Sequence, residues 1–295
     1  MSIWISFTLL AAFMQAVRTA GQKQLSLSLS AIATTLVRFL FAVPLVWLYL
    51  FVVAHFTQLS LPTLSGEFVQ SALFAAASQI LATALMIKAF DYKNFAVATS
   101  LAKTEAVLTA LIGVIAFNAT LSGIGWFSVL IGVVGVIILS KSDLSYRSLI
   151  KTPAAFYGVG AGAFFALSTL WIRQASLSLD THLMLSAAFT LAFMVSVQTA
   201  VIILYLLFRQ PNQLKLIKRH WKIASFVGFA SMLGSVGWFT AASYQDAAYV
   251  KALGQIEFFF TLIITRKFFK EPISSKEYLG MLLILMSVII LLIFA

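Results

Sequence analysis

Two short stretches place charged side chains inside segments that are otherwise apolar. They are residues 94–109 (NFAVATSLAKTEAVLT), with Lys103 and Glu105, and residues 246–261 (DAAYVKALGQIEFFFT), with Lys251 and Glu257. A lysine in such a position can bind a carboxylate or a phosphate, and a glutamate can carry a proton or brace neighbouring helices. Because ionisable residues are costly to bury in apolar surroundings, they mark candidate functional sites.

The two stretches are copies of each other, aligned without gaps at an offset of 152 residues, which pairs Glu105 with Glu257. A second matching pair, KQLSLSL from Lys23 and RQASLSL from Arg173, lies at an offset of 150. The sequence therefore predicts an internal duplication.

The composition indicates a membrane protein. Of the 295 residues, 61% are hydrophobic and 10% are charged, whereas soluble domains are roughly 45–50% apolar. Ten segments approach the length of about 20 residues that a transmembrane helix needs. They are residues 3–20, 31–54, 68–90, 95–117, 124–140, 154–171, 183–208, 223–244, 247–267 and 278–294. The predicted fold class is an all-α polytopic membrane protein with ten transmembrane helices.

The duplication divides these helices into two repeats of five, over residues 1–145 and 152–295. Because five is an odd number, the second repeat must cross the membrane in the opposite sense to the first. At 1.5 Å per residue, Glu105 and Glu257 lie about 16 Å into their helices, near the membrane midplane. Inverted repeats with polar residues at the midplane are typical of secondary transporters.

The basic charge is distributed unevenly between the two sides of the membrane. The net charge is +11, and sixteen of the twenty lysines and arginines lie in or near the odd-numbered connections. The positive-inside rule then makes these connections cytoplasmic and places both termini outside. We expect contact with anionic lipid headgroups and no nucleic-acid partner, since there is no folded basic domain. The expected location is the plasma membrane, the inner membrane of a bacterium.

The spacing in the helix that carries Glu257 predicts two faces. Lys251 and Gln255 are four residues apart and share one face, which we expect to line a water-filled central cavity together with Lys103 of the other repeat. Glu257 and Glu105 lie on the opposite face, where they serve either in coupling or in helix packing.

Further candidates for substrate binding are polar or aromatic residues in other predicted helices. Gln79 either binds the substrate or makes an interhelical hydrogen bond. Trp171 lies either on the wall of the cavity or at the membrane interface. Trp238 and Tyr244 stack on an organic substrate or pack in the core. Arg38 lies within the second helix as a coupling or structural residue whose partner the sequence does not identify.

Arg18, near the end of the first helix, either lines a pathway or extends to the cytoplasmic interface, and we favour the interface.

The end of the second half resembles a known family. Glu257-x13-Glu271-Pro272-Ile273-Ser274, followed by Gly280, is similar to the end of an EamA-type repeat of the drug/metabolite transporter superfamily. The resemblance implies two inverted repeats around a cavity walled by helices 1, 3, 4, 6, 8 and 9. It also implies gradient-driven export or exchange of small metabolites such as amino acids. The chain departs from the family pattern because neither midplane glutamate precedes a proline and Ala119 replaces the second acid of the first repeat. Both termini of such family members are often cytoplasmic, but we retain the assignment from charge.

Other classes of protein fit the sequence less well. There is no phosphate-binding loop of a primary pump, and His55, His182 and His220 fall in separate connections, so we expect no enzyme, metal site or cofactor. We therefore expect a secondary active transporter, an exporter or exchanger of small polar metabolites, acting as a monomer or homodimer with proton or exchange coupling. The alternatives are a lipid flippase or scramblase of the same fold and a structural membrane protein.

Overall fold

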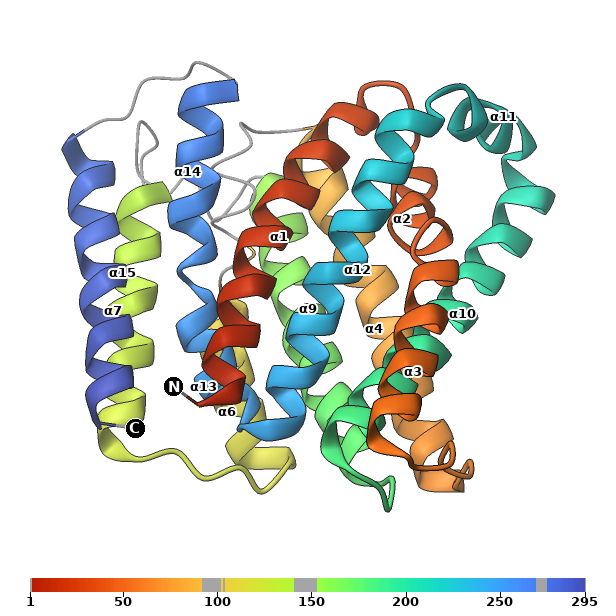
Figure 1. Cartoon of the computed structure of the whole chain (residues 1–295). Helices are drawn as coiled ribbons and strands as arrows, with labels where there is room; N and C mark the ends of the chain where they lie inside the picture. The colour runs from red at the N-terminus through yellow and green to blue at the C-terminus, as the bar shows by residue number, and fades with distance from the viewer. Residues whose placement is uncertain (1, 92–101, 103, 141–152, 269–274, 295) are drawn as a thin grey trace.

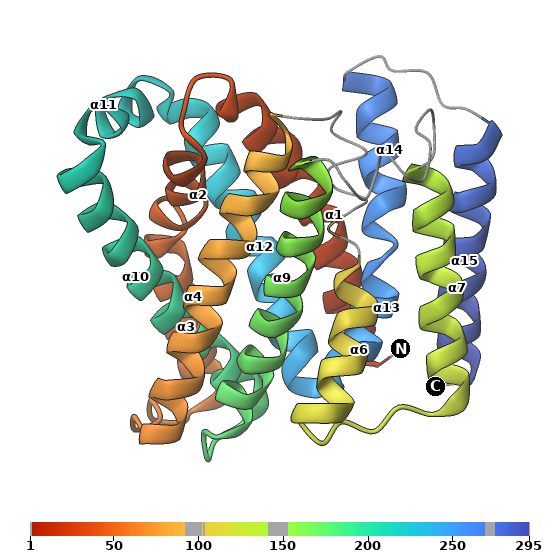
Figure 2. The same cartoon turned by 180° about the vertical axis from the view of Figure 1, so that it is seen from behind.

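The computed structural model describes residues 2–91, 102, 104–140, 153–268 and 275–294. Within these ranges, all regular secondary structure is helical (Figures 1 and 2). The helices are α1 (Ile3–Ser26), α2 (Ala31–Leu40), α3 (Val43–Thr57), α4 (Gly66–Ala89), α6 (Glu105–Ala116), α7 (Gly123–Ser140), α9 (Pro153–Leu177), α10 (Leu183–Arg209), α11 (Pro211–Arg219), α12 (Trp221–Tyr244), α13 (Ala247–Gly254), α14 (Glu257–Phe268) and α15 (Ser275–Phe294). The all-α polytopic fold, with ten spans in two inverted five-helix repeats, is confirmed.

Two of the predicted spans are broken rather than continuous. The span predicted over residues 31–54 is divided into α2 and α3, and the span over 247–267 is divided into α13 and α14. Between α13 and α14, the backbone N–H groups of Gln255 and Ile256 donate to carbonyls three residues earlier. This tighter turn interrupts the α-helical register near the middle of the bundle.

The equivalent position in the first repeat also begins a helix. Glu105 is the first residue of α6, as Glu257 is of α14. Thr109 donates a hydrogen bond to the backbone carbonyl of Glu105 at 2.7 Å, and Thr261 does the same to Glu257 at 3.0 Å. From the glutamate onward, the two copies of the duplicated stretch therefore share a local structure that their aligned sequences predict.

The helix packing follows the inverted duplication. The most extensive contacts join α1 to α12, α4 to α9, and α7 to α15. The offset of about 150 residues maps α1 onto α9 and α12 onto α4, so the first two pairs are equivalent. The same offset maps α7 onto α15. Two reciprocal hydrogen bonds hold this pair: the Ser128 hydroxyl donates to the carbonyl of Ser287 at 2.8 Å, and the Ser287 hydroxyl donates to the carbonyl of Ser128 at 2.7 Å. Each pair joins one repeat to the other.

The small helix α11 was predicted only as a connection. It begins at Pro211 and carries Lys215, Lys218 and Arg219. It lies at the end of the bundle opposite to the two termini, beside the connection from α1 to α2 (Figure 1). The two termini lie at the same end, as an even number of crossings requires. Which end is cytoplasmic remains a prediction from the distribution of charge.

Candidate functional site

A small cavity lies between α1, α2, α4, α9, α12 and α13, and side chains of both repeats line it. The lining residues are Gln15, Arg38, Gln79, Phe165, Ser168, Thr169, Ile172, Ser235, Trp238, Phe239 and Lys251. Its volume is about 20 Å³, enough for about one water molecule. Five of these helices belong to spans that the family resemblance implied as cavity walls, and α2 is an addition.

Lys251 lies on the wall of this cavity and joins the two repeats. Its ammonium Nζ is 3.6 Å from Oε1 of Glu105 and 4.1 Å from the centre of the Trp238 ring. The side chain of Lys251 is only 5% exposed, so it does not extend to the membrane surface. The structure thus brings together Glu105 of α6, Trp238 of α12 and Lys251 of α13, three residues that the sequence indicated as candidates.

Glu257 is held by a second network of hydrogen bonds. Gln15 Nε2 donates to Oε2 of Glu257 at 2.6 Å, and Trp238 Nε1 donates to Oε1 of Gln15 at 2.7 Å. As the first residue of α14, Glu257 also lies at the positive end of a helix dipole, which favours a carboxylate. The glutamate is therefore connected to the cavity through Gln15 and Trp238.

Arg38 lies on the cavity wall and is 2% exposed. Its Nη1 donates to the hydroxyl of Thr83 at 2.7 Å, whereas its Nε has no hydrogen-bond partner in the part of the chain that the structure describes. Thr83 is the polar partner on α4 that the sequence did not identify.

Arg18 is completely buried, so the expected position at the interface is wrong. All three guanidinium nitrogens lack a hydrogen-bond partner among the described residues, as do both polar atoms of the Gln22 side chain. The carboxylates of Glu257 and Glu105 lie within electrostatic range of Arg18. The spacing of Gln15, Arg18 and Gln22 along one helical face was the signal that could have indicated their burial.

The position of Gln79 is compatible with both of its predicted roles, substrate binding and an interhelical hydrogen bond. It lines the cavity, and its Oε1 accepts a hydrogen bond at 3.0 Å from Gln198 on α10.

Gln255 does not share the cavity face with Lys251. Its side chain lies against Gly132 of α7, where an added Cβ would be 2.5 Å from Gln255 Nε2. The four-residue spacing failed as a guide because α13 ends at Gly254, so the turn that follows rotates Gln255 away.

Trp171 and Tyr244 are not among the residues that line the central cavity. Trp171 stacks on Phe74 with ring centres 5.2 Å apart and meets the edge of the Phe117 ring at 5.0 Å. Tyr244 is the last residue of α12 and is partly exposed. Lys103 lies outside the described residues, so its predicted position in the cavity stays a prediction. Within the described ranges, no group of three or more acidic, histidine or cysteine side chains could hold a metal ion.

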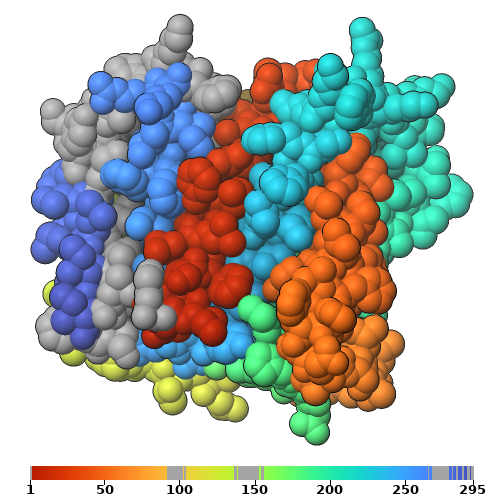
Figure 3. Space-filling view, viewed as in Figure 1, coloured from red at the N-terminus to blue at the C-terminus, as the bar shows by residue number. Residues whose placement is uncertain are grey.

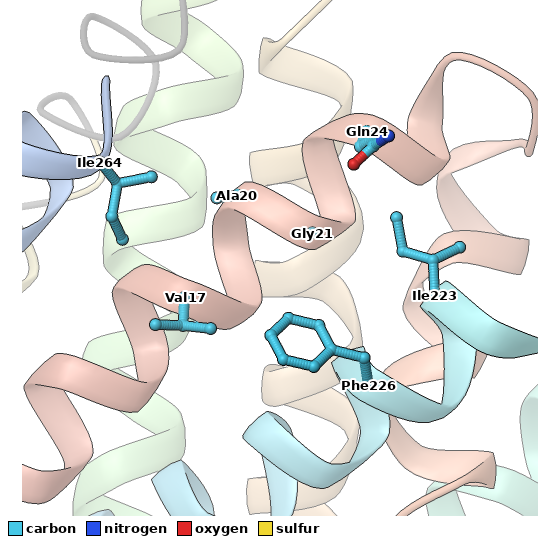
Figure 4. A pocket seen from close by; sticks show the side chains of 7 residues that line it. All are labelled: Val17, Ala20, Gly21, Gln24, Ile223, Phe226 and Ile264. Carbon is cyan, nitrogen blue, oxygen red and sulfur yellow. The ribbon is translucent and has the colours of Figure 1, made fainter. Parts of the chain in front are cut away.

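A second, larger pocket opens on the side of the bundle. It has a volume of about 220 Å³ and lies between α1, α12 and α14 (Figure 4). Figure 3 shows α1 between these two helices on the same face. The lining residues are Val17, Ala20, Gly21, Gln24, Ile223, Phe226 and Ile264. With one amide among apolar side chains, this pocket suits hydrocarbon rather than a charged group.

A bundle of two inverted repeats around a small polar cavity is the architecture of a secondary transporter. The model of the EamA-like transporter family matches residues 2–141 and 152–293. The chain therefore belongs to this family, within the drug/metabolite transporter superfamily, and is an integral membrane transporter.

Twenty-seven chains of solved structures are similar to this chain. One, titled "Crystal structure of protein", has a TM-score of 0.75 at 12% sequence identity and covers 100% of this chain and 97% of its own. At this identity the likeness shows the fold alone. No curated protein matches the chain.

Proposed function

We propose that this protein is a secondary active exporter or exchanger of small polar metabolites, such as amino acids or other compounds with a carboxylate or phosphate. The observation that carries the proposal is the cavity between the repeats, where Arg38 and Lys251 lie beside Trp238. The cations suit an acidic group of a substrate, and the indole suits an organic body.

Alternating access around this cavity fits the proposal. About 20 Å³ is too small for a metabolite, so binding requires the surrounding helices to move apart. The breaks between α2 and α3 and between α13 and α14 lie in helices that line the cavity. In secondary transporters, discontinuous helices typically form the substrate site, and access alternates when one repeat moves against the other. In this proposal the moving halves are the repeats over residues 1–145 and 152–295.

The proposal also covers location, coupling and assembly. The protein lies in the plasma membrane, and the basic connections indicate that both termini are outside. Coupling is to protons or to a counter-substrate, with Glu105 and Glu257 as coupling or structural residues. The unit is a monomer or homodimer that needs no cofactor.

Binding is tested by thermal unfolding of the purified protein with amino acids, organic acids, sugar phosphates and lipophilic cations. A bound substrate stabilises the folded state by mass action. Compounds that raise the unfolding temperature are then tested for counterflow in proteoliposomes. We expect counterflow by the parent protein and its loss in Lys251→Ala and Lys103→Ala. Absence of both stabilisation and counterflow across the panel contradicts the proposal.

The lateral pocket supports one alternative function, a lipid flippase or scramblase. The lining between α1, α12 and α14 is largely apolar and could hold an acyl chain. The alternative is favoured if fluorescent phospholipids cross proteoliposome membranes faster with the protein present and Val17→Trp, which fills the pocket, abolishes this effect.

A further inference from the structure

The charged side chains buried among the described residues do not balance. They are Arg18, Arg38 and Lys251, which are cations, and Glu105 and Glu257, which are anions. Burial of an uncompensated charge is costly, and a bound counter-ion relieves that cost. The interior of the bundle therefore favours a ligand that brings negative charge.

The surplus charge is at Arg38. Lys251 lies beside Glu105, and Arg18 is within electrostatic range of both glutamates. The hydrogen-bond partner of Arg38 is an uncharged hydroxyl, that of Thr83. Arg18 on α1 is the second buried guanidinium, and its three nitrogens have no hydrogen-bond partner among the described residues.

Several hydrogen-bond donors of these buried side chains lack acceptors among the described residues. They are Nε of Arg38, all three guanidinium nitrogens of Arg18, and the hydroxyl of Ser168 on the cavity wall. Buried polar groups in native proteins nearly always have a partner, so Arg38 and Ser168, which line the cavity, can donate to an acceptor bound there. Guanidinium forks match the oxygens of carboxylates and phosphates.

We propose that the transported substrate is a net anion whose carboxylate or phosphate group binds Arg38 in the central cavity, with Arg18 supplying the second positive charge. This inference rests on the proposed transport function and assigns the anion to the arginine pair instead of Lys251, which is already paired with Glu105.

The test is thermal unfolding in lipid nanodiscs with succinate and inorganic phosphate as anionic probes. L-Alanine and choline are the zwitterionic and cationic controls, all at equal ionic strength. We expect succinate or phosphate to stabilise the parent protein, and Arg38→Gln to weaken this binding by about tenfold or more. Arg209→Gln, at the exposed end of α10, is the matched control and should bind the probe as the parent does.

Substitution of Arg18 distinguishes a residue that binds the anion from one that only supports the fold. Because the Arg18 guanidinium has no hydrogen-bond partner in the described part of the chain, Arg18→Gln should unfold at the same or a higher temperature than the parent in the absence of probes. It should nevertheless lose anion binding. If Arg38→Gln does not fold, Arg38→Lys keeps the charge and should bind the probe more weakly than the parent.

The outcomes separate the two proposals. Stabilisation and counterflow with alanine or choline, but not with succinate or phosphate, leave the transport function standing and overturn the anion site. Anion binding that survives in Arg38→Gln and Arg38→Lys also overturns it. Absence of counterflow with every compound overturns the transport function itself.

Discussion

The ammonium of Lys251 lies 3.6 Å from a carboxylate oxygen of Glu105, and this contact joins α13 of the second repeat to α6 of the first. Both side chains are less than 10% exposed. The pair therefore links two residues from the duplicated stretches across the repeat interface, at the edge of the central cavity.

Removal of one member of this pair should destabilise the protein. Glu105→Gln leaves the Lys251 ammonium buried without this carboxylate, and breaking a buried pair typically costs about 3–5 kcal/mol. The double variant Glu105→Gln/Lys251→Met should be closer to the parent than the sum of the two single variants, because neither member of the pair is left buried without the other. Thermal unfolding of the four proteins forms a double-mutant cycle, and additive effects would contradict the contact.

The bridge from Trp238 through Gln15 to Glu257 should be the main contribution of Gln15 to stability. Gln15→Leu removes both hydrogen bonds and should cost about 1–3 kcal/mol for each buried group left unsatisfied. Thermal unfolding measures the loss. Gln24→Leu is the control on the same helix, because Gln24 is exposed and its amide lies in the lateral pocket. Equal unfolding temperatures for the two variants would argue against the bridge.

Close packing of α1 against α12 depends on Gly237. A Cβ at this position would lie 2.5 Å from the carbonyl oxygen of Phe7 and 2.8 Å from Cβ of Ala11. Gly237→Ala should therefore cost about 1–3 kcal/mol or more, since the backbone of α1 must shift. Gly66→Ala is the matched control, because no atom lies within 4 Å of an added Cβ there. We expect reduced folding yield on detergent size exclusion for Gly237→Ala alone.

Arg173 should matter more for stability than its ion-pair partner. Its Nη2 is 2.8 Å from Oδ1 of Asp246, while Nη1 donates to the carbonyls of Ala242 and Gln245 at the end of α12, both at 2.7 Å. Asp246→Asn loses only a partly exposed pair, worth at most about 1 kcal/mol. Arg173→Met also leaves the two carbonyls unpaired and should cost about 2 kcal/mol more. Unfolding temperatures in the reverse order would show that the helix end does not need Arg173.

The fold was largely predictable because its signals are local in the sequence. Long apolar segments require helices in a membrane, and an odd number of helices per repeat requires inversion. The breaks in two spans were missed because hydropathy does not distinguish a continuous helix from one interrupted near the middle.

The site was predictable only in part. The sequence identified Lys251, Trp238, Gln79 and Arg38, which line the cavity, but placed Gln255 beside Lys251 by assuming an unbroken helix. It also assigned Arg18 to the interface, since a basic residue near a predicted helix end usually reaches water.

The amino-acid sequence by itself determined the membrane class, the duplication and the two midplane glutamates, because burial cost and repeat spacing act along the chain. The tertiary structure alone decided which charges meet. Glu105 contacts Lys251 of the other repeat, Glu257 contacts Gln15, and Arg38 donates to the hydroxyl of Thr83. Such pairings join residues as many as 242 positions apart, and they depend on how α1, α6, α13 and α14 pack, which no local pattern specifies.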